Sequence, residues 1–472
     1  NLDGLLDYYF FGNGRGNCVI YFQQPDGSFE ASADALKTTA RYSNDTLSVG
    51  DPIPYNFVEP EVSVIDFNND GYPDMWINAA DLNCKNEGEQ TQRFSYLFAN
   101  DGFGTLTQFA GAVVQYKKAN GTSSWGDING DGFLDMLLNG DGWLNSGENS
   151  DQVWRLFKNQ GGNAVEEVWK NEIGRQASIG HGSLIVDWDN DGKLDIFGGG
   201  WSGRYNKQTT ELYLGTDPAN FTFTASTTAF QGASEQALLP VDVNGDKKVD
   251  LLASGFSGAP LQKRAAFLIL NESPNASVAP DAPTDLNAVY DESENMVTFT
   301  WKAPASESGK YGTTYNFSLK NKTTGKWLYN PMAVVGGEKN GWRKVAGQMG
   351  NVFTNKNFEL YDLPAGEYEW TVQAINGAFF GGAFAAVKTF SIGGSSTKEM
   401  QERNLRIFSK EGKLIINGAL TDGVVNVYGI GGNRIASTVL SNQPAVELTQ
   451  GIYIVEVLRS GYKNVIAKIA VQ

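Results

Sequence analysis

Residues Asp127–Asp135 read DINGDGFLD, and this nine-residue phrase recurs along the N-terminal part of the chain. The other complete copies are DFNNDGYPD from Asp66, DWDNDGKLD from Asp187 and DVNGDKKVD from Asp242. Successive starts lie 61, 60 and 55 residues apart. A further copy without its first two residues opens the chain, with its third, fifth, sixth and ninth places filled by Asn1, Asp3, Gly4 and Asp7. A phrase that returns at a near-constant interval predicts a repeat fold.

The residue types in this phrase are those of a cation-binding loop. Oxygen-bearing side chains at positions 1, 3, 5 and 9, with the carbonyl of position 7, form a hard-oxygen shell that suits calcium better than magnesium. An EF-hand is excluded, because its glutamate at position 12 is replaced by Ile77, Leu138, Gly198 or Ala253. The alternative, that these clusters are ordinary turn formers, is disfavoured by their regular spacing. Bound ions would also relieve repulsion in a chain of net charge −16.

The residues around each loop are short apolar runs rich in β-branched and aromatic side chains. Val62–Ile65 and Met75–Asn78 flank one loop, so we expect each loop to join two strands. Two more strand-like runs follow in most repeats, as at 153–157 and 165–169. Four strands in about 60 residues predict one blade of a β-propeller. Five blades or parts of blades are visible.

Over residues 1–272 these repeats resemble the FG-GAP or VCBS-type calcium-loop β-propellers of integrin α-subunits and bacterial surface proteins. The resemblance implies Ca²⁺ ligands at Asn1, Asp3, Asp7, Asp66, Asn68, Asp70, Asp74, Asp127, Asn129, Asp131, Asp135, Asp187, Asp189, Asp191, Asp195, Asp242, Asn244, Asp246 and Asp250. The Asp242 copy departs from the pattern, because Lys247 replaces the turn glycine. The family often has seven blades, and we expect sequence upstream of Asn1 to complete the ring.

The connections between the second and third strands are predicted to lie on the face opposite the aspartate loops. They carry aromatic and arginine side chains flanked by glycine, namely Trp143, Trp201, Arg204, Tyr205 and Phe256. Such side chains suit sugar faces or peptides, although packing between blades is the more ordinary use of aromatic residues. The single histidine, His181, excludes sites that need two imidazoles. Cys18 and Cys84 are compatible with one disulfide or with two free thiols.

Two further β modules are predicted after the propeller. Residues 273–281 read as a linker, and residues 282–392 resemble a fibronectin type III domain with Trp301 in its core and Tyr368 in a tyrosine corner. The long segment Lys320–Asn357 departs from that pattern. After a linker at 393–400, residues 401–472 resemble the type A C-terminal sorting domain of Bacteroidetes type IX secretion, most closely in the phrases VNVYGIGGNRI and LTQGIYIVEV. This resemblance implies the type IX secretion machinery as a partner, in a diderm host, and export to the cell surface.

Charge and hydropathy narrow the class of function. The net charge of −16 argues against a nucleic-acid partner, and no apolar run reaches the 18 residues of a membrane span. The sequence therefore predicts an all-β, secreted or cell-surface protein of a Bacteroidetes-type bacterium. We expect it to bind Ca²⁺ and a glycan or protein in an adhesion-like role, and not to be an enzyme. Two alternatives stay open: a polysaccharide-degrading enzyme with carboxylates in a propeller groove, and an architectural component of the cell envelope.

Overall fold

The computed structural model describes residues 6–11, 18–24, 26–32, 36–37, 57–81, 92–100, 102, 105–109, 121–139, 154–171, 182–202, 207–257, 262–292, 295–361, 363–393, 406–410, 413–417, 423–429, 431–439, 446–458 and 465–471. Regular structure in these ranges is β-strand, apart from single 3-10 turns at Pro218–Asn220 and Ala305–Glu307. None of the described helical turns could cross a membrane. The chain forms two compact units: Asn1–Asn287 with Thr300–Phe358 and Glu369–Thr389, and Ala288–Phe299 with Glu359–Tyr368 and Phe390–Gln472.

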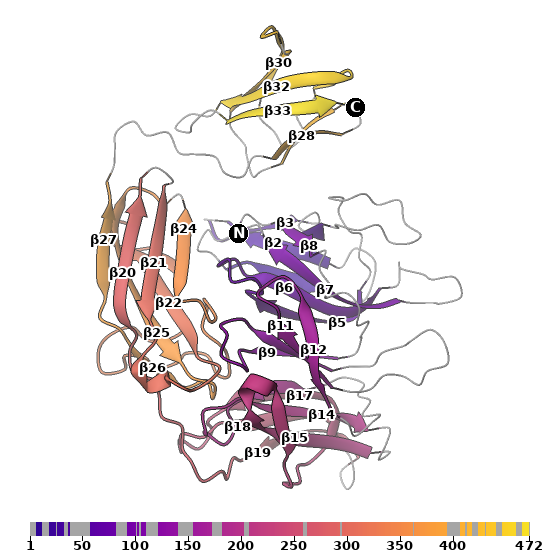
Figure 1. Cartoon of the computed structure of the whole chain (residues 1–472), viewed down its shortest axis with the longest axis vertical. Coiled ribbons are helices and arrows are strands. Elements are labelled where there is room, and N and C mark those ends of the chain that lie inside the picture. Colours follow the sequence, from indigo (N-terminus) through magenta and orange to yellow (C-terminus); the bar gives the residue numbers. More distant parts are fainter. Residues whose placement is uncertain are drawn as a thin grey trace. The chain divides into compact units, whose positions relative to one another are not determined.

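Each complete aspartate phrase of the first unit connects two antiparallel strands of one sheet, and we call each such sheet, together with the sheet of β1 to β3, a blade (Figure 1). Blade 1 contains β1 (Tyr8–Phe11), β2 (Cys18–Gln23) and β3 (Phe29–Ser32). Blade 2 contains β5 (Phe57–Ile65), β6 (Asp74–Asp81), β7 (Gln92–Asn100) and β8 (Leu106–Gln108), and blade 3 contains β9 (Ser123–Gly126), β10 (Asp135–Leu138), β11 (Arg155–Asn159) and β12 (Val165–Lys170). Blade 4 contains β13 (Ser183–Val186), β14 (Asp195–Ser202), β15 (Lys207–Asp217) and β16 (Thr222–Ala225), and blade 5 contains β17 (Ala233–Val241), β18 (Asp250–Ser257) and β19 (Arg264–Ile269).

The strand order confirms the predicted position of the aspartate loops. In blade 3 the order is β12-β11-β10-β9, and the eight-residue loop between β9 and β10 is closed by the pair Asp135 and Gly126. Blade 5 contains three paired strands among the described residues, as its sequence predicts. One pairing is not predicted: β4 (Leu36–Lys37), which follows blade 1 in the chain, pairs in parallel with the outer strand β8 of blade 2. Blade 1 thus contributes an edge strand to its neighbour.

The blades pack face to face, which is the property that defines a propeller. Each buried cluster of this part draws side chains from two consecutive blades. Between blades 2 and 3 the rings of Trp76 and Trp125 meet edge to face at 5.8 Å, and between blades 3 and 4 Trp154 meets Tyr213 in the same way. A third cluster joins blades 4 and 5 around Val186. The all-β propeller fold is therefore confirmed.

The first strands of neighbouring blades are also joined through hydroxyl side chains. The Ser63 and Ser123 hydroxyl oxygens lie 2.9 Å apart, and those of Thr122 and Ser183 lie 2.8 Å apart. The Ile185 amide donates to the Ser124 hydroxyl. The first strand of each blade lies at the edge of its sheet, so no further strand of the blade pairs with its outer side. These side chains form hydrogen bonds at that edge.

Residues 284–392 form two further sheets. One has the order β20-β21-β24, and the other has the order β23-β22-β25-β26 with β27 paired to β25. The bounds are β20 (Thr284–Asp291), β21 (Met296–Lys302), β22 (Thr314–Asn321), β23 (Trp327–Tyr329), β24 (Asn357–Tyr361), β25 (Gly366–Ile375), β26 (Gly381–Phe384) and β27 (Lys388–Ile392). The buried Trp301 ring lies 6.2 Å from Phe317 of the facing sheet, as expected of a sandwich core. Tyr368 Oη donates to the Pro364 carbonyl, which is the predicted tyrosine corner.

The last sheets of the second unit contain every strand expected between 405 and 471. One pairs β28 (Arg406–Lys410) with β29 (Lys413–Asn417), and the other has the order β31-β30-β32-β33. Its members are β30 (Val424–Gly429), β31 (Arg434–Val439), β32 (Gly451–Leu458) and β33 (Val465–Val471). Alternate residues of β32, from Tyr453 to Val457, face a buried aliphatic cluster, which explains the alternating pattern of the phrase GIYIVEV.

Candidate metal centre in the aspartate loops

The backbone of each complete loop turns sharply at the fourth and sixth positions. In blade 3 these are Gly130 and Gly132, with φ of 75° and 93°, and in blade 2 they are Asn69 and Gly71, with φ of 56° and 86°. Glycine and asparagine adopt this left-handed region most readily. The phrase therefore curls so that its oxygen-bearing side chains face inward.

The ninth-position aspartate closes the loop through both of its oxygens. Asp135 accepts one hydrogen bond from the Ile128 amide and another from the Asn159 amide, each at 3.0 Å. The other complete copies repeat this arrangement at Asp74, Asp195 and Asp250. Asp7 of the headless first copy accepts the corresponding bond from Gln23 at 3.0 Å, so that copy folds as a true member of the repeat. Asn1 and Asp3 lie outside the described residues.

The first-position aspartates of blades 3 and 4 each have one buried oxygen without a partner. In Asp127 and Asp187, Oδ2 accepts the amide of the turn glycine, at 3.0 and 3.1 Å, whereas Oδ1 is buried and has no hydrogen-bond partner. A buried carboxylate oxygen left without a donor is costly. The same atom is unpartnered in two successive blades, which indicates a cation-binding position in preference to a local packing fault.

The third- and fifth-position side chains complete an oxygen-rich pocket. In blade 4, carboxylate oxygens of Asp187, Asp189 and Asp195 lie within 4.8 Å of one another. In blades 2 and 3 the third residue is asparagine, and its amide donates to the fifth-position aspartate, at 2.8 Å from Asn129 to Asp131. Only oxygen ligands are offered, which suits a hard cation of six or more ligands. The residues of these three loops therefore fit Ca²⁺.

Burial and mutual repulsion raise the pKa values of these carboxyl groups. Burial, followed by the charge of Asp70, raises the pKa of Asp66 to about 7. Burial raises the pKa of Asp187 to about 7 and that of Asp195 to about 8, with neighbouring aspartates adding to the shift. Burial also raises the pKa of Asp127 to about 6. A divalent cation reverses this effect, because it stabilises the ionised forms that burial disfavours.

The blade 4 loop also borders an open space. A cavity of about 130 Å³ is lined on one side by Asp187 and Asp191 of the loop and on the other by Glu307 and Lys310. The Lys310 ammonium is 3.0 Å from the buried Glu307 carboxylate. The blade 4 loop therefore borders a cavity that is partly lined by charged side chains.

The blade 5 loop differs from the other three in the way its sequence predicts. Lys247 has φ of 65° at the place of the turn glycine. Both Asp242 oxygens accept backbone amides, from Gly245 and Lys247, and the loop residues Asn244 and Asp246 are exposed. No oxygen of Asp242 is left buried and unpaired, so the observation that indicates an ion in blades 3 and 4 is not found in blade 5.

Most of the predicted ligand-binding face lies outside the described residues. This applies to Trp143, Arg204 and Tyr205, and also to His181 and Cys84. Trp201 is placed in β14 opposite Gln208, with only its backbone described. Phe256 lies in β18 opposite Arg264 and is 37% exposed. Cys18 begins β2, and its pairing with Cys84 stays a prediction.

One contact at the loops was not predicted from the sequence. Asn355, from the irregular segment after β23, donates its side-chain amide to Asp66 Oδ2 at 2.7 Å. Both oxygens of Asp66 are therefore hydrogen-bonded, as in Asp242, since Oδ1 and Oδ2 also accept the amides of Asp70 and Gly71, and the unpartnered oxygen of blades 3 and 4 is not found in blade 2. The only signal in the sequence is the length of Lys320–Asn357, which exceeds what the resemblance to a fibronectin domain predicts.

Comparisons with known proteins support the repeat. Residues 127–198 and 187–253 match the family model described as an FG-GAP-like repeat. No curated protein matches the chain. Among solved structures, an endo-arabinase from Bacteroides thetaiotaomicron matches with 10% identity and a TM-score of 0.29, covering 55% of this chain and 88% of its own. An exo-β-1,3-galactanase from Phanerochaete chrysosporium matches with 10% identity and a TM-score of 0.29, covering 81% of this chain and 90% of its own.

These matches correct one prediction. Both solved structures are glycosidases, and the prediction that this chain is not an enzyme is withdrawn. The physical reason is that glycoside hydrolysis needs two carboxyl groups and no imidazole, so the single His181 does not exclude it. At this identity and TM-score the likeness assigns no activity to the chain. What the findings show together is an all-β propeller that contains FG-GAP-like repeats and an acidic cluster in blade 4.

Proposed function

We propose that this protein is a calcium-binding β-propeller of the cell exterior that binds a glycan or a surface protein in an adhesion-like role. The observation that carries the calcium assignment is the pair of buried, unpartnered oxygens Asp127 Oδ1 and Asp187 Oδ1. Asp66, Asp127 and Asp187 supply the first ligand of three loops, and the third, fifth and ninth positions supply the rest. An ion there stabilises ionised carboxylates and so stiffens the hairpins that form the blades.

Calcium is favoured over magnesium because of the ligand count and geometry. Four side chains and a carbonyl per loop are more protein ligands than magnesium ordinarily accepts, since it keeps several waters and demands a strict octahedron. The loops also depend on left-handed turns at two positions, and calcium tolerates the uneven distances that such a turn imposes.

The calcium assignment is tested by calorimetric titration of the full chain after chelation, with calcium and then magnesium. Free calcium at 100 times its dissociation constant should stabilise the fold by about 2.7 kcal/mol per site, and magnesium by much less. Asp127→Asn keeps an oxygen for the Gly132 amide but removes the charge of the carboxylate. It should abolish calcium binding at the blade 3 loop. Asp281→Asn, an exposed change in the linker, is the matched control. Unchanged binding in Asp127→Asn would contradict the assignment.

The export and ligand proposals rest on other parts of the chain. The C-terminal sheet supports a folded sorting domain at 401–472, which the type IX secretion machinery of a Bacteroidetes-type bacterium would recognise. Deleting these residues should retain the protein in the periplasm. The exposed Phe256 beside Arg264 is consistent with a binding surface at the end of the strands away from the loops. Glycan-array binding that survives alanine substitution of both Trp143 and Trp201 would contradict their role in it.

A further inference from the structure

Within the first unit, the three calcium loops are covered by residues from the second half of the same unit. We call these residues the docking segments: 310–314, 347–358 and 376–379. The Tyr311 amide donates to the Gly192 carbonyl at 2.9 Å, and the Gly312 amide donates to the Asp127 carbonyl at 3.2 Å. The Asp187 amide donates to the Gly377 carbonyl at 3.0 Å. The loops of blades 3 and 4 thus exchange backbone hydrogen bonds with two docking segments.

Side chains add a second layer of contacts at blades 2 and 3. Asn355 donates to Asp66 Oδ2 at 2.7 Å, and Thr354 Oγ1 donates to the Gly132 carbonyl at 2.6 Å. Both residues are buried, with 8% and 5% exposure. The side-chain amide of Asn69, in the blade 2 loop, donates to the same Gly132 carbonyl at 2.8 Å. Gly132 therefore links two metal loops and one docking segment.

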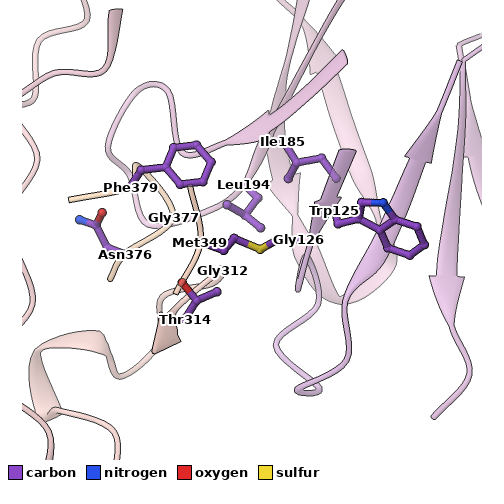
Figure 2. Close-up of a pocket in the computed structure, with 10 residues that line it drawn as sticks. All are labelled: Trp125, Gly126, Ile185, Leu194, Gly312, Thr314, Met349, Asn376, Gly377 and Phe379. Carbon is purple, nitrogen blue, oxygen red and sulfur yellow. The ribbon is translucent and has the colours of Figure 1, made fainter. Parts of the chain in front are cut away.

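Apolar contacts place the docking segments against the seams between blades. Met349 and Phe353 pack on the cluster between blades 2 and 3, and Tyr311 packs on the cluster between blades 3 and 4. Phe379 packs on the cluster between blades 4 and 5. Figure 2 shows Met349 and Phe379 of the docking segments beside Leu194, and the remaining space in this region is about 10 Å³. That volume holds about one water, so the segments pack closely in this region, whereas the cavity of about 130 Å³ lies where Lys310 and Gly377 face the blade 4 loop.

The glycines of the loops also lie against the docking segments. A Cβ added to Gly130 would lie 3.1 Å from the Tyr311 ring, and one added to Gly192 would lie 3.1 Å from Lys310 Cγ. The space left by these glycines is filled by the docking segments. The loops are therefore shaped on one side for an ion and on the other for this part of the chain.

We propose that calcium binding to the loops of Asp66, Asp127 and Asp187 and the seating of the docking segments are coupled, so that each strengthens the other. This inference rests on the proposed calcium binding. An ion sets the positions of the carboxylates and loop carbonyls that Asn355, Thr354 and Gly312 contact. By linkage, the factor by which docking raises the calcium affinity equals the factor by which calcium binding raises the equilibrium constant for docking. The blade 5 loop, whose Asp242 makes none of these contacts, is outside the coupled set.

The first test is hydrogen exchange of the full chain with excess calcium or with chelator. The amides of Tyr311 and Gly312 donate directly to loop carbonyls, so chelation should raise their exchange rates at least fivefold. Peptides that cover 352–355 should respond in the same way. Peptides that cover 424–429, in the second unit, serve as the internal reference and should not change.

The second test is calcium affinity in variants of the docking segments. Asn355→Leu and Thr354→Val remove the two side-chain donors with little change of volume, and each should weaken calcium binding at least fivefold by titration. Asn340→Leu is the control, because its amide, in the same irregular segment, donates to the Phe384 carbonyl and not to a loop. If Asn340→Leu lost calcium affinity to the same extent, the loss would be a general effect on folding, and the inference would be overturned.

The outcomes separate the two proposals. If calcium binds the wild-type chain but exchange at 311–312 and 352–355 does not respond, and the variants bind as wild type, the coupling is overturned and calcium binding stands. If no calcium binds at all, both fall. A calcium response at 311–312 together with weakened binding in Asn355→Leu supports the coupling.

Discussion

The side-chain amide of Asn355 donates a hydrogen bond of 2.7 Å to Oδ2 of Asp66, which lies 289 residues earlier in the chain. One residue belongs to an irregular segment beside a β-sandwich, and the other begins an aspartate loop of a propeller blade. Asp66 is nevertheless buried at 1% exposure, because the segment covers it. The contact shows that the candidate metal sites of this protein are assembled from distant parts of the sequence.

Asp135→Asn should destabilise the protein whether or not calcium is present. The Asp135 side chain is fully buried and accepts two backbone amides, whereas asparagine offers one acceptor and turns its own N–H groups toward a donor. We expect a loss of about 2 to 4 kcal/mol in urea unfolding in chelator, and a larger loss in calcium, where the variant also lacks a proposed ligand. Asp131→Asn is the matched control, because this aspartate is exposed. The substitution should lower the free energy of unfolding by under about 1 kcal/mol in chelator. Equal losses in chelator would contradict a structural role for the ninth position.

Lys247→Gly should stabilise the protein in chelator. Lys247 has φ of 65°, a conformation that costs a residue with a Cβ about 1 kcal/mol, although glycine also gains entropy in the unfolded chain. We expect a net gain of about 0.5 to 1 kcal/mol in the free energy of unfolding. Lys248→Gly removes the same charge from a neighbouring residue without positive φ and should lower stability. A loss in both variants would show that the strain at Lys247 is compensated elsewhere.

Glu61→Gln should change the pH dependence of stability on the alkaline side. Burial raises the pKa of Glu61 from 4.5 to about 7, while hydrogen bonds from Ser63 and Ser123 oppose this shift. A carboxyl whose pKa is raised by folding contributes stability that is complete below pH 4.5 and lost as the pH rises through 7. In saturating calcium, we therefore expect the free energy of unfolding of Glu61→Gln to exceed that of the wild type by about 1 to 3 kcal/mol at pH 8. At pH 4.5 the two should differ little. Exposed Glu30→Gln should be neutral at both, and a pH-independent difference would refute the argument.

Tyr368→Phe should weaken the sandwich without affecting calcium binding. The Tyr368 hydroxyl donates to the Pro364 carbonyl inside a buried corner, and its ring stacks on Phe390 at 5.1 Å. Removing the hydroxyl should cost about 1 to 1.5 kcal/mol by thermal unfolding, with an unchanged calcium titration. Tyr361→Phe, whose hydroxyl bonds a glutamate beside it, should cost less. A change in calcium affinity for Tyr368→Phe would contradict the separation of the two effects.

The sequence by itself determined the elements whose causes are local. The nine-residue phrase specifies a tight loop because its glycines, asparagines and aspartates favour left-handed turns, and the apolar runs beside it can only be strands of a hairpin. The headless copy at Asp7, the strained turn at Lys247 and the corner at Tyr368 were all predictable in this way, since each depends on residues close in the chain.

Only the tertiary structure decided what surrounds those loops. The unpaired oxygens of Asp127 and Asp187, the donors at Thr354 and Asn355 and the parallel pairing of β4 with β8 all depend on which surfaces meet after the chain has folded. A single sequence does not encode these contacts as a local pattern, because burial and partner choice are set by residues hundreds of positions apart. That is why the loops and their candidate ligands were predictable while the residues that cover them were not.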